Sequence, residues 1–193
     1  MGILMGWGRL RFRSILTTAL LLSSGLAIAQ QGLDLDGHSV NPLAANPGKI
    51  VVLVFVRRDC PVSSRYAPVI QQISKQFAER ANFWLVFPDK TESAASIRQY
   101  LADYKYHVPA LRDPEHVLVK MGRVQITPEV AVFDPDRHLV YDGRIDDWYF
   151  DLSRSRTAPT THELEDAIRA ALAGKVLARS EVRGVGCYIS DLD

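Results

Sequence analysis

The sequence predicts an α/β fold in which helices cover both faces of a central mixed sheet of about four to five strands. Three observations support this prediction. The run from Ile50 to Val56 (IVVLVFV) is continuously apolar and rich in β-branched residues, which is typical of a strand buried on both faces. Segments with helical and strand patterns then alternate along the chain. The last two predicted strands follow each other directly and precede a helix, which indicates an antiparallel hairpin.

The length and composition fit one globular domain. The chain has 193 residues, of which 47% are hydrophobic and 23% charged, and its net charge is +1. These values allow one well-packed core. The basic residues are scattered and no nucleic-acid motif occurs, so we expect no nucleic-acid partner. The sequence also lacks a G-x-x-x-x-G-K-[ST] motif and a Cys-x-x-Cys-His motif, so neither a bound nucleotide nor covalent haem is expected.

The first 29 residues have the features of a signal peptide. Three arginines between positions 9 and 13 precede an apolar stretch from Ile15 to Ile28, and Ala27-Ile28-Ala29 forms an A-x-A cleavage signal. The alternative is an uncleaved membrane anchor, but the apolar stretch is shorter than the ~20 residues that a membrane span needs. We therefore expect a mature chain that begins near Gln30 and is exported to a bacterial periplasm.

The mature chain is expected to begin with a hairpin, a strand and a helix. Gly32 to Pro47 contains an Asp-Gly turn and predicts a small N-terminal hairpin, and Lys49 to Val56 follows as the central strand. Pro61 to Arg80 has apolar residues at helical spacing and predicts a helix. Pro68 should kink this helix, because proline has no N–H to donate to the carbonyl of Ser64.

A second strand and two helical segments are predicted in the middle of the chain. Asn82 to Phe87 (NFWLVF) is the strand, and Thr91 is placed to cap the helix that follows it. The apolar face of that helix contains Ile97, Tyr100, Leu101 and Tyr104. Asp113-Pro114 is expected to open a short helical segment through Met121, which Gly122 closes.

The predicted hairpin lies between two irregular segments. Thr127-Pro128 precedes the strand from Glu129 to Phe133, and a turn leads to the strand from His138 to Tyr141. The loop from Arg144 to Pro159 is irregular and rich in charge. Its three adjacent aromatic residues, 148–150, cannot all face one side, so at least one is expected in the core. Its acidic residues, Asp146 and Asp147, are expected to be solvated or to form local salt bridges.

A helix and a tail complete the chain. Thr160 to Ala173 predicts a helix that begins with a capping box of Thr160 and Glu163 and ends at Gly174. The expected domain therefore covers residues 30–173, and residues 174–193 form a C-terminal tail. The tail has no strong periodicity and carries the second cysteine of the mature chain, Cys187, in a Gly-Val-Gly-Cys sequence that should be mobile enough to reach across the domain.

Cys60 is the residue whose position most strongly suggests chemistry. It lies between the buried strand and the predicted helix, at the positive end of the helix dipole and close to the free N–H groups of the first turn. Both features favour the thiolate, which is the reactive form of cysteine. Pro61 fits the first helical position, where a missing N–H has no cost. The placement therefore indicates a redox thiol more than a packing one.

Several motifs resemble the thioredoxin-like superfamily. They are Asp59-Cys60-Pro61-Val62-Ser63, the kinking Pro68, Thr127-Pro128-Glu129 and the hairpin of residues 134–141. The resemblance covers roughly Gly32 to Ala173, and the helical insert after the second strand is similar to the redoxin branch, which includes the alkyl hydroperoxide reductase/thiol-specific antioxidant proteins. In that fold the proline that corresponds to Pro128 is commonly cis and faces the active cysteine.

The chain departs from the superfamily pattern at two positions. Thioredoxins carry Cys-x-x-Cys, but Ser63 stands at the second position here, so the motif cannot close a local disulfide. Typical peroxiredoxins carry a threonine three residues before the cysteine, where this chain has Arg57. The resemblance therefore implies a redoxin scaffold without specifying one activity.

The resemblance implies an exported thiol oxidoreductase with an antioxidant or thiol redox role. Cys60 would attack a peroxide or a disulfide, Cys187 would resolve the product to a disulfide, and an external thiol would regenerate the protein. Ser63, Thr127-Pro128 and Arg58 are expected to support Cys60 beside Pro61, although strand alternation means that Arg57 and Arg58 cannot both face the thiol. No cofactor or metal is required.

Two alternatives remain open at this stage. Cys60 and Cys187 can form a permanent structural disulfide in a non-catalytic thioredoxin-like binding module, since an exported protein meets oxidising conditions. The chain can also bind copper through Cys60 and a distant histidine, as Sco-type proteins of this fold do. The sequence does not decide whether the disulfide forms within one chain or between two.

Overall fold

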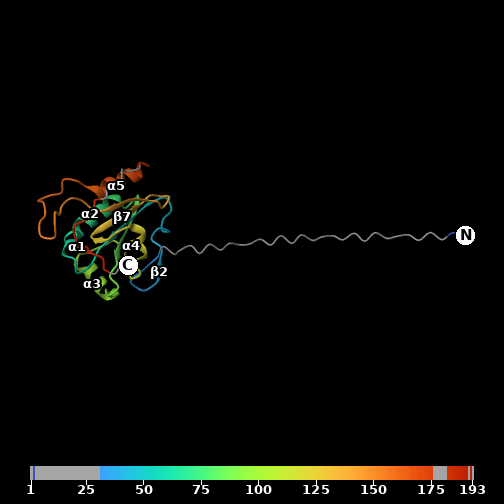
Figure 1. Cartoon of the computed structure of the whole chain (residues 1–193), viewed down its shortest axis with the longest axis horizontal. Helices are drawn as coiled ribbons and strands as arrows, with labels where there is room; N and C mark the ends of the chain where they lie inside the picture. Colours follow the sequence, from blue (N-terminus) through green and yellow to red (C-terminus); the bar gives the residue numbers. More distant parts are fainter. Residues whose placement is uncertain (1, 3–30, 176–181, 191, 193) are drawn as a thin grey trace.

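The computed structural model describes residues 2, 31–175, 182–190 and 192 (Figure 1). The predicted signal peptide, with its cleavage site after Ala29, lies almost entirely outside the described residues. The helices and strands are β1 (Gly32–Leu33), β2 (Ser39–Val40), β3 (Ile50–Phe55), α1 (Pro61–Arg65), α2 (Ala67–Phe77), β4 (Ala81–Phe87), α3 (Ala94–Asp103), β5 (Ala110–Arg112), α4 (Val117–Gly122), β6 (Ile126–Thr127), β7 (Glu129–Phe133), β8 (Leu139–Gly143), α5 (Glu163–Leu172) and β9 (Cys187–Tyr188). Among the helices of these residues, none has the length and apolar character needed to cross a membrane.

The central sheet is mixed, as predicted, but it is wider than expected. Its order is β2-β1-β5-β4-β3-β7-β8, so it has seven strands rather than four to five. β3 pairs in parallel with β4 and antiparallel with β7, and β7 and β8 form the predicted hairpin. The additional width arises because the N-terminal hairpin joins the sheet through β5. β5 was not predicted, since three residues are too few to show an alternating pattern.

The core lies on both sides of β3, whose six residues are all fully buried. Alternate side chains of a strand point to opposite faces. Ile50, Val52 and Val54 pack with the helices α1, α2, α3 and α5, whereas Val51, Leu53 and Phe55 pack with α4. Helices therefore cover both faces of the sheet, as the continuous apolar run predicted.

The predicted kink at Pro68 is a break between two helices. α1 ends at Arg65 and α2 begins at Ala67, with Tyr66 between them. Because Pro68 has no N–H, the carbonyl of Ser64 loses the partner that a continuous helix would supply. α2 ends at Phe77, three residues before the end expected from the sequence, Arg80.

Two predicted N-caps are wrong. Ser93 caps α3, because its Oγ accepts a hydrogen bond from the N–H of Ser96 at 3.1 Å. Thr91 instead donates its hydroxyl to Asp89 at 2.7 Å. α5 begins at Glu163, and no side-chain cap hydrogen bond is found at its N-cap, His162. The two residues of the expected capping box have other partners, since Thr160 donates to Asp147 at 2.5 Å and Glu163 accepts from Arg144.

The short helix α4 begins four residues later than the expected start at Asp113. Asp113 is 1% exposed, and its carboxylate accepts the N–H groups of Val117 and Val119 at 2.9 and 2.8 Å. Burial raises the pKa of Asp113, and these hydrogen bonds oppose that effect. The carboxylate thus satisfies the free donors at the start of α4. Arg123, rather than Gly122, adopts the left-handed conformation that ends the helix.

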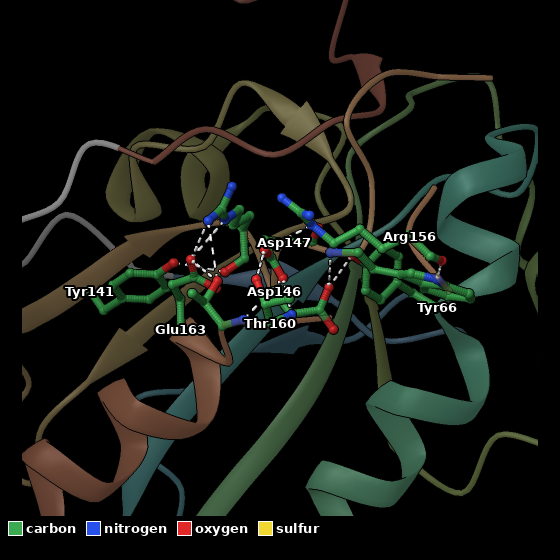
Figure 2. A network of polar contacts seen from close by, with 10 residues as sticks. Tyr66, Tyr141, Asp146, Asp147, Arg156, Thr160 and Glu163 are labelled. Carbon is green, nitrogen blue, oxygen red and sulfur yellow. Dashed lines mark hydrogen bonds and ion pairs between the residues drawn. The ribbon is translucent and has the colours of Figure 1, made fainter. Parts of the chain in front are cut away.

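The loop between β8 and α5 is fixed by a polar network (Figure 2). Asp146 and Asp147 are 4% and 6% exposed, so the expectation of solvated charges is wrong, although Asp147 does form a local salt bridge with Arg156 at 2.9 Å. Tyr66 donates its hydroxyl to Asp146 at 2.5 Å. Because Tyr66 directly follows α1, this bond fixes the end of the helix that begins after Cys60. The aromatic residues divide as predicted, with Tyr149 buried and Phe150 exposed.

Candidate active site

Cys60 lies at the carboxyl end of β3 and is the N-cap residue of α1. Its backbone is extended, its carbonyl accepts the first helical N–H from Ser64 at 3.1 Å, and Pro61 occupies the first helical position. This is the junction that the sequence predicts. The residue is 0% exposed, so its thiol is covered on every side in this structure.

The C-terminal tail brings the second cysteine to the first. β9 pairs antiparallel with β6, and the register places Cys187 opposite Thr127. Both cysteines are free thiols, and the Cys187 thiol is in hydrogen-bonding contact with Cys60. The two residues are thus brought together by a strand pair that was not predicted, since each strand has only two residues.

The loop of β6 completes the site. The Thr127–Pro128 peptide bond is cis, as the resemblance implies. The carbonyl of Thr127 accepts a hydrogen bond from the Cys60 thiol at 3.2 Å, and the hydroxyl of Thr127 donates to the carbonyl of Cys187 at 3.2 Å. Thr127 therefore contacts both cysteine residues and fixes the position of one relative to the other.

The two thiols have different affinities for protons. Burial alone raises the pKa of Cys60, but hydrogen bonds from the Cys187 thiol and from the N–H and hydroxyl of Ser63 outweigh burial, and the net pKa lies below the usual value. Burial and the contact with Cys60 raise the pKa of Cys187 to about 12. Cys60 is therefore the first thiol to ionise, and Cys187 remains a hydrogen-bond donor to it.

Thiolate formation should consequently occur in two separate steps. An ordinary cysteine ionises around pH 8.5. The ultraviolet absorbance of thiolate in the reduced protein is expected to rise first below that pH, as Cys60 ionises, and again near pH 12, as Cys187 ionises. In Cys187→Ala the thiol donor is lost, so the first step should move to higher pH. A first step that stays in place in this variant would contradict the assignment of the hydrogen bond.

Some of the supporting residues predicted from the sequence lie near the two thiols, and others do not. Ser63 is fully buried, and its Oγ accepts the N–H of Arg57 at 3.4 Å, which leaves its O–H free to point to the sulfur. Arg58 is exposed, and the hydrogen bond found for it joins its N–H to Glu92 at 2.9 Å. Arg57 is the arginine beside the tail, because its guanidinium donates to the carbonyl of Tyr188 at 3.1 Å.

Glu129 is a site residue that sequence reasoning missed. It is 0% exposed, and its Oε1 accepts the N–H of Gly184 at 2.7 Å. Its Oε2 accepts the N–H groups of Gln125 and Ile126 at 3.2 and 3.3 Å. One buried carboxylate thus joins the tail to the segment that contains β6. A carboxylate at the start of the apolar strand EVAVF, directly after Thr-Pro, is the sequence signal that identifies such a residue.

The side chains that lie close enough to hold a metal ion are elsewhere. Among the described residues, one group of three such side chains was found, Asp134, Asp136 and His138, in the turn between β7 and β8. It includes neither cysteine. The described geometry therefore adds no support for a copper site at Cys60.

Comparison with known proteins agrees with this architecture. Residues 48–139 match the family model described as thioredoxin-like. A hypothetical protein of Sinorhizobium meliloti is 20% identical, with a TM-score of 0.69 over 82% of this chain and 88% of its own. No curated protein sequence matches the chain significantly.

Two further solved structures share the fold. DsbF of MTB, in mixed oxidised and reduced forms, is 22% identical, with a TM-score of 0.56 over 74% of this chain and 97% of its own. A secreted Mycobacterium tuberculosis disulfide oxidoreductase is 18% identical, with a TM-score of 0.51 over 72% and 94%. The fold is therefore thioredoxin-like, and residues 48–139 resemble the thioredoxin-like family. Its assignment to the redoxin branch stays a prediction.

Proposed function

We propose that this protein is an exported thiol–disulfide oxidoreductase in which Cys60 is the nucleophile and Cys187 the resolving thiol. One observation carries the proposal. Two free thiols lie in hydrogen-bonding contact, and their surroundings move their pKa values in opposite directions. Such a separation divides the roles in a redox pair, since the thiol that ionises first attacks and the other follows.

The reaction begins with the Cys60 thiolate, which attacks one sulfur of a substrate disulfide. The substrate S–S bond breaks, a mixed disulfide forms at Cys60, and the first substrate thiol leaves with a proton from solvent. Cys187 then loses its proton and attacks the Cys60 sulfur, which releases the second substrate thiol. The protein ends with a Cys60–Cys187 disulfide, and the substrate has gained two electrons and two protons. An external thiol restores the reduced form.

The surrounding groups stabilise the states of this cycle. The N–H and hydroxyl of Ser63 favour the thiolate and so lower the pKa of Cys60. Thr127 accepts a hydrogen bond from Cys60 in its thiol form and holds the backbone of Cys187. Pro61 fits the first position of α1, where a missing N–H leaves no helical hydrogen bond unmade. Arg58, an expected support, stays a prediction for this role.

A disulfide is better supported than a peroxide as the substrate. Arg57 stands where typical peroxiredoxins carry a threonine, and its guanidinium is already paired with Asp59 at 2.8 Å and Asp89 at 3.2 Å. One structural neighbour is described as a secreted disulfide oxidoreductase. An antioxidant role toward peroxides therefore stays a prediction from the sequence.

Export is part of the proposal. It rests on the signal sequence that is predicted for residues 1–29, and one structural neighbour is described as secreted. A periplasmic location would supply both disulfide substrates and a membrane-linked or soluble thiol reductant. Location of the mature protein by fractionation, with sequencing of its N-terminus, would test cleavage after Ala29.

The test of the chemistry is the intact mass of the reduced protein after one equivalent of cystine. The wild type should lose two hydrogens, because Cys187 resolves the mixed disulfide. Cys187→Ser should instead keep one cysteinyl group on Cys60. Hydrogen peroxide in a parallel reaction should oxidise the wild type more slowly. An unchanged mass with cystine in both proteins would exclude the proposed function.

A further inference from the structure

The tail segment 182–190 is held along its whole described length. Its contacts include hydrogen bonds from Arg144 N–H to Val182, from Arg57 to Tyr188 and from Ile189 N–H to Gln125, at 3.1, 3.1 and 2.9 Å. Ile189 is 6% exposed in the core cluster beside α4. Residues 182–190 are thus part of the folded domain, and they cover the thiol that is proposed to react.

The docked tail depends on two glycines. A Cβ atom on Gly186 would overlap the carbonyl oxygen of Thr127, and one on Gly184 would lie 2.9 Å from the Cγ of Glu129 and 2.9 Å from the carbonyl of Pro128. The backbone approach is therefore closer than a residue with a side chain allows. A Gly-Val-Gly-Cys segment fits this edge, whereas ordinary polypeptides, which carry side chains at both positions, do not fit it in the same way.

β6 also contacts Cys60, because the carbonyl of Thr127 accepts a hydrogen bond from the Cys60 thiol. A cysteine inside a polypeptide has backbone on both sides of its disulfide, so it needs an edge along which that backbone can lie. β9 occupies this edge through the Ile126–Tyr188 and Thr127–Cys187 pairs. A low-molecular-weight disulfide has no flanking backbone. It can therefore reach the Cys60 sulfur when only the residues around Cys187 move.

From this arrangement we propose that the docked tail makes the reduced protein selective for low-molecular-weight disulfides, with Gly184 and Gly186 as the specificity-determining residues. Polypeptide disulfides react only from the form in which β9 has left β6. The inference rests on the proposed function, since it concerns the substrates of the Cys60 thiolate. It predicts that loosening the tail changes which substrate reacts, and not only how fast the internal disulfide closes.

The experiment compares two substrates with one leaving group in a Cys187→Ser background. Mixed disulfides of 2-nitro-5-thiobenzoate with cysteine and with an unstructured single-cysteine peptide both release a coloured thiolate when Cys60 attacks the cysteine sulfur. The ratio of peptide rate to cysteine rate is measured for the parent, Gly184→Ala and Gly186→Ala. It should rise by at least about tenfold in both glycine variants, as expected if the undocked form is a minor state of at most ~10%.

The outcomes distinguish a failure of the proposed selectivity from a failure of the proposed function. An unchanged ratio, or equal gains for both substrates, would overturn the selectivity while leaving Cys60 as the nucleophile. No release of thiolate from either substrate in the parent would overturn the proposed function and this inference with it. Tyr188→Ala is the matched control in the same tail, since that side chain is 72% exposed, and its ratio should equal the parent's. Circular dichroism confirms that each variant is folded.

Discussion

Replacing Cys60 with serine will abolish reduction of cystine and of the nitrothiobenzoate substrates. The loss should be at least about 10³-fold, the scale on which removal of a catalytic nucleophile acts in other enzymes. The physical reason is that the serine hydroxyl does not ionise near neutral pH, whereas the hydrogen bonds from Cys187 and Ser63 favour the Cys60 thiolate. Release of coloured thiolate, followed under an excess of substrate, measures the effect.

The companion variant Cys187→Ser shows which thiol acts first. It should retain a single turnover at a rate within about tenfold of the wild type, because a serine hydroxyl still donates a hydrogen bond to the Cys60 sulfur. It should then stop at the mixed disulfide. A Cys60→Ser protein that still forms a mixed disulfide at Cys187 would reverse the assigned roles. Equal residual rates in the two variants would show that neither thiol is the preferred nucleophile.

Replacing Glu129 with glutamine should release the tail and weaken the fold together. Each carboxylate oxygen accepts at least one backbone N–H, so the amide group of glutamine must point an N–H toward another donor whichever way it is turned. Leaving buried donors without an acceptor costs about 1–3 kcal/mol. For a domain of this size each 1 kcal/mol lowers Tm by roughly 2–4 °C.

Two measurements check this prediction. Thermal unfolding should show the lower Tm, and the variant should accumulate the mixed disulfide with cystine because Cys187 is no longer held at Cys60. Glu115→Gln removes one exposed carboxylate and serves as the control, with unchanged Tm and unchanged resolution. If Glu129→Gln forms the internal disulfide at the wild-type rate, Glu129 does not position the tail.

The parts of the fold that were predictable depend on local pattern. The buried strand β3 shows a continuous apolar run, the break before α2 follows from Pro68, and the position of Cys60 follows from the junction of strand and helix. Each is determined by neighbouring residues. The caps were less certain because two adequate residues lie within three positions, and the choice of Ser93 over Thr91 depends on Asp89, which already binds Thr91.

The parts that were not predictable depend on distant pairs. The pairing of β6 with β9 joins two-residue strands that are far apart in the chain, and neither has a pattern of its own. The glycines near Cys187 suggested a mobile tail, whereas the structure shows that they permit a close approach to Thr127 and Glu129. The sequence suggested that the two cysteines act together, either as a redox pair or as a structural disulfide, but the contact between them is seen only in the folded chain.

The position of Cys187 after the last helix links redox state to the folding equilibrium. A bond between Cys60 and Cys187 would enclose the chain from α1 through α5, which is most of the domain. In the chain-entropy description, closing a loop of this size restricts the unfolded ensemble by about 5 kcal/mol. By thermodynamic linkage, folding must favour the oxidised pair over the reduced pair by the same free energy. A reductant that opens such a disulfide in the folded protein would therefore have to supply this linkage free energy in addition to that of an unconstrained disulfide.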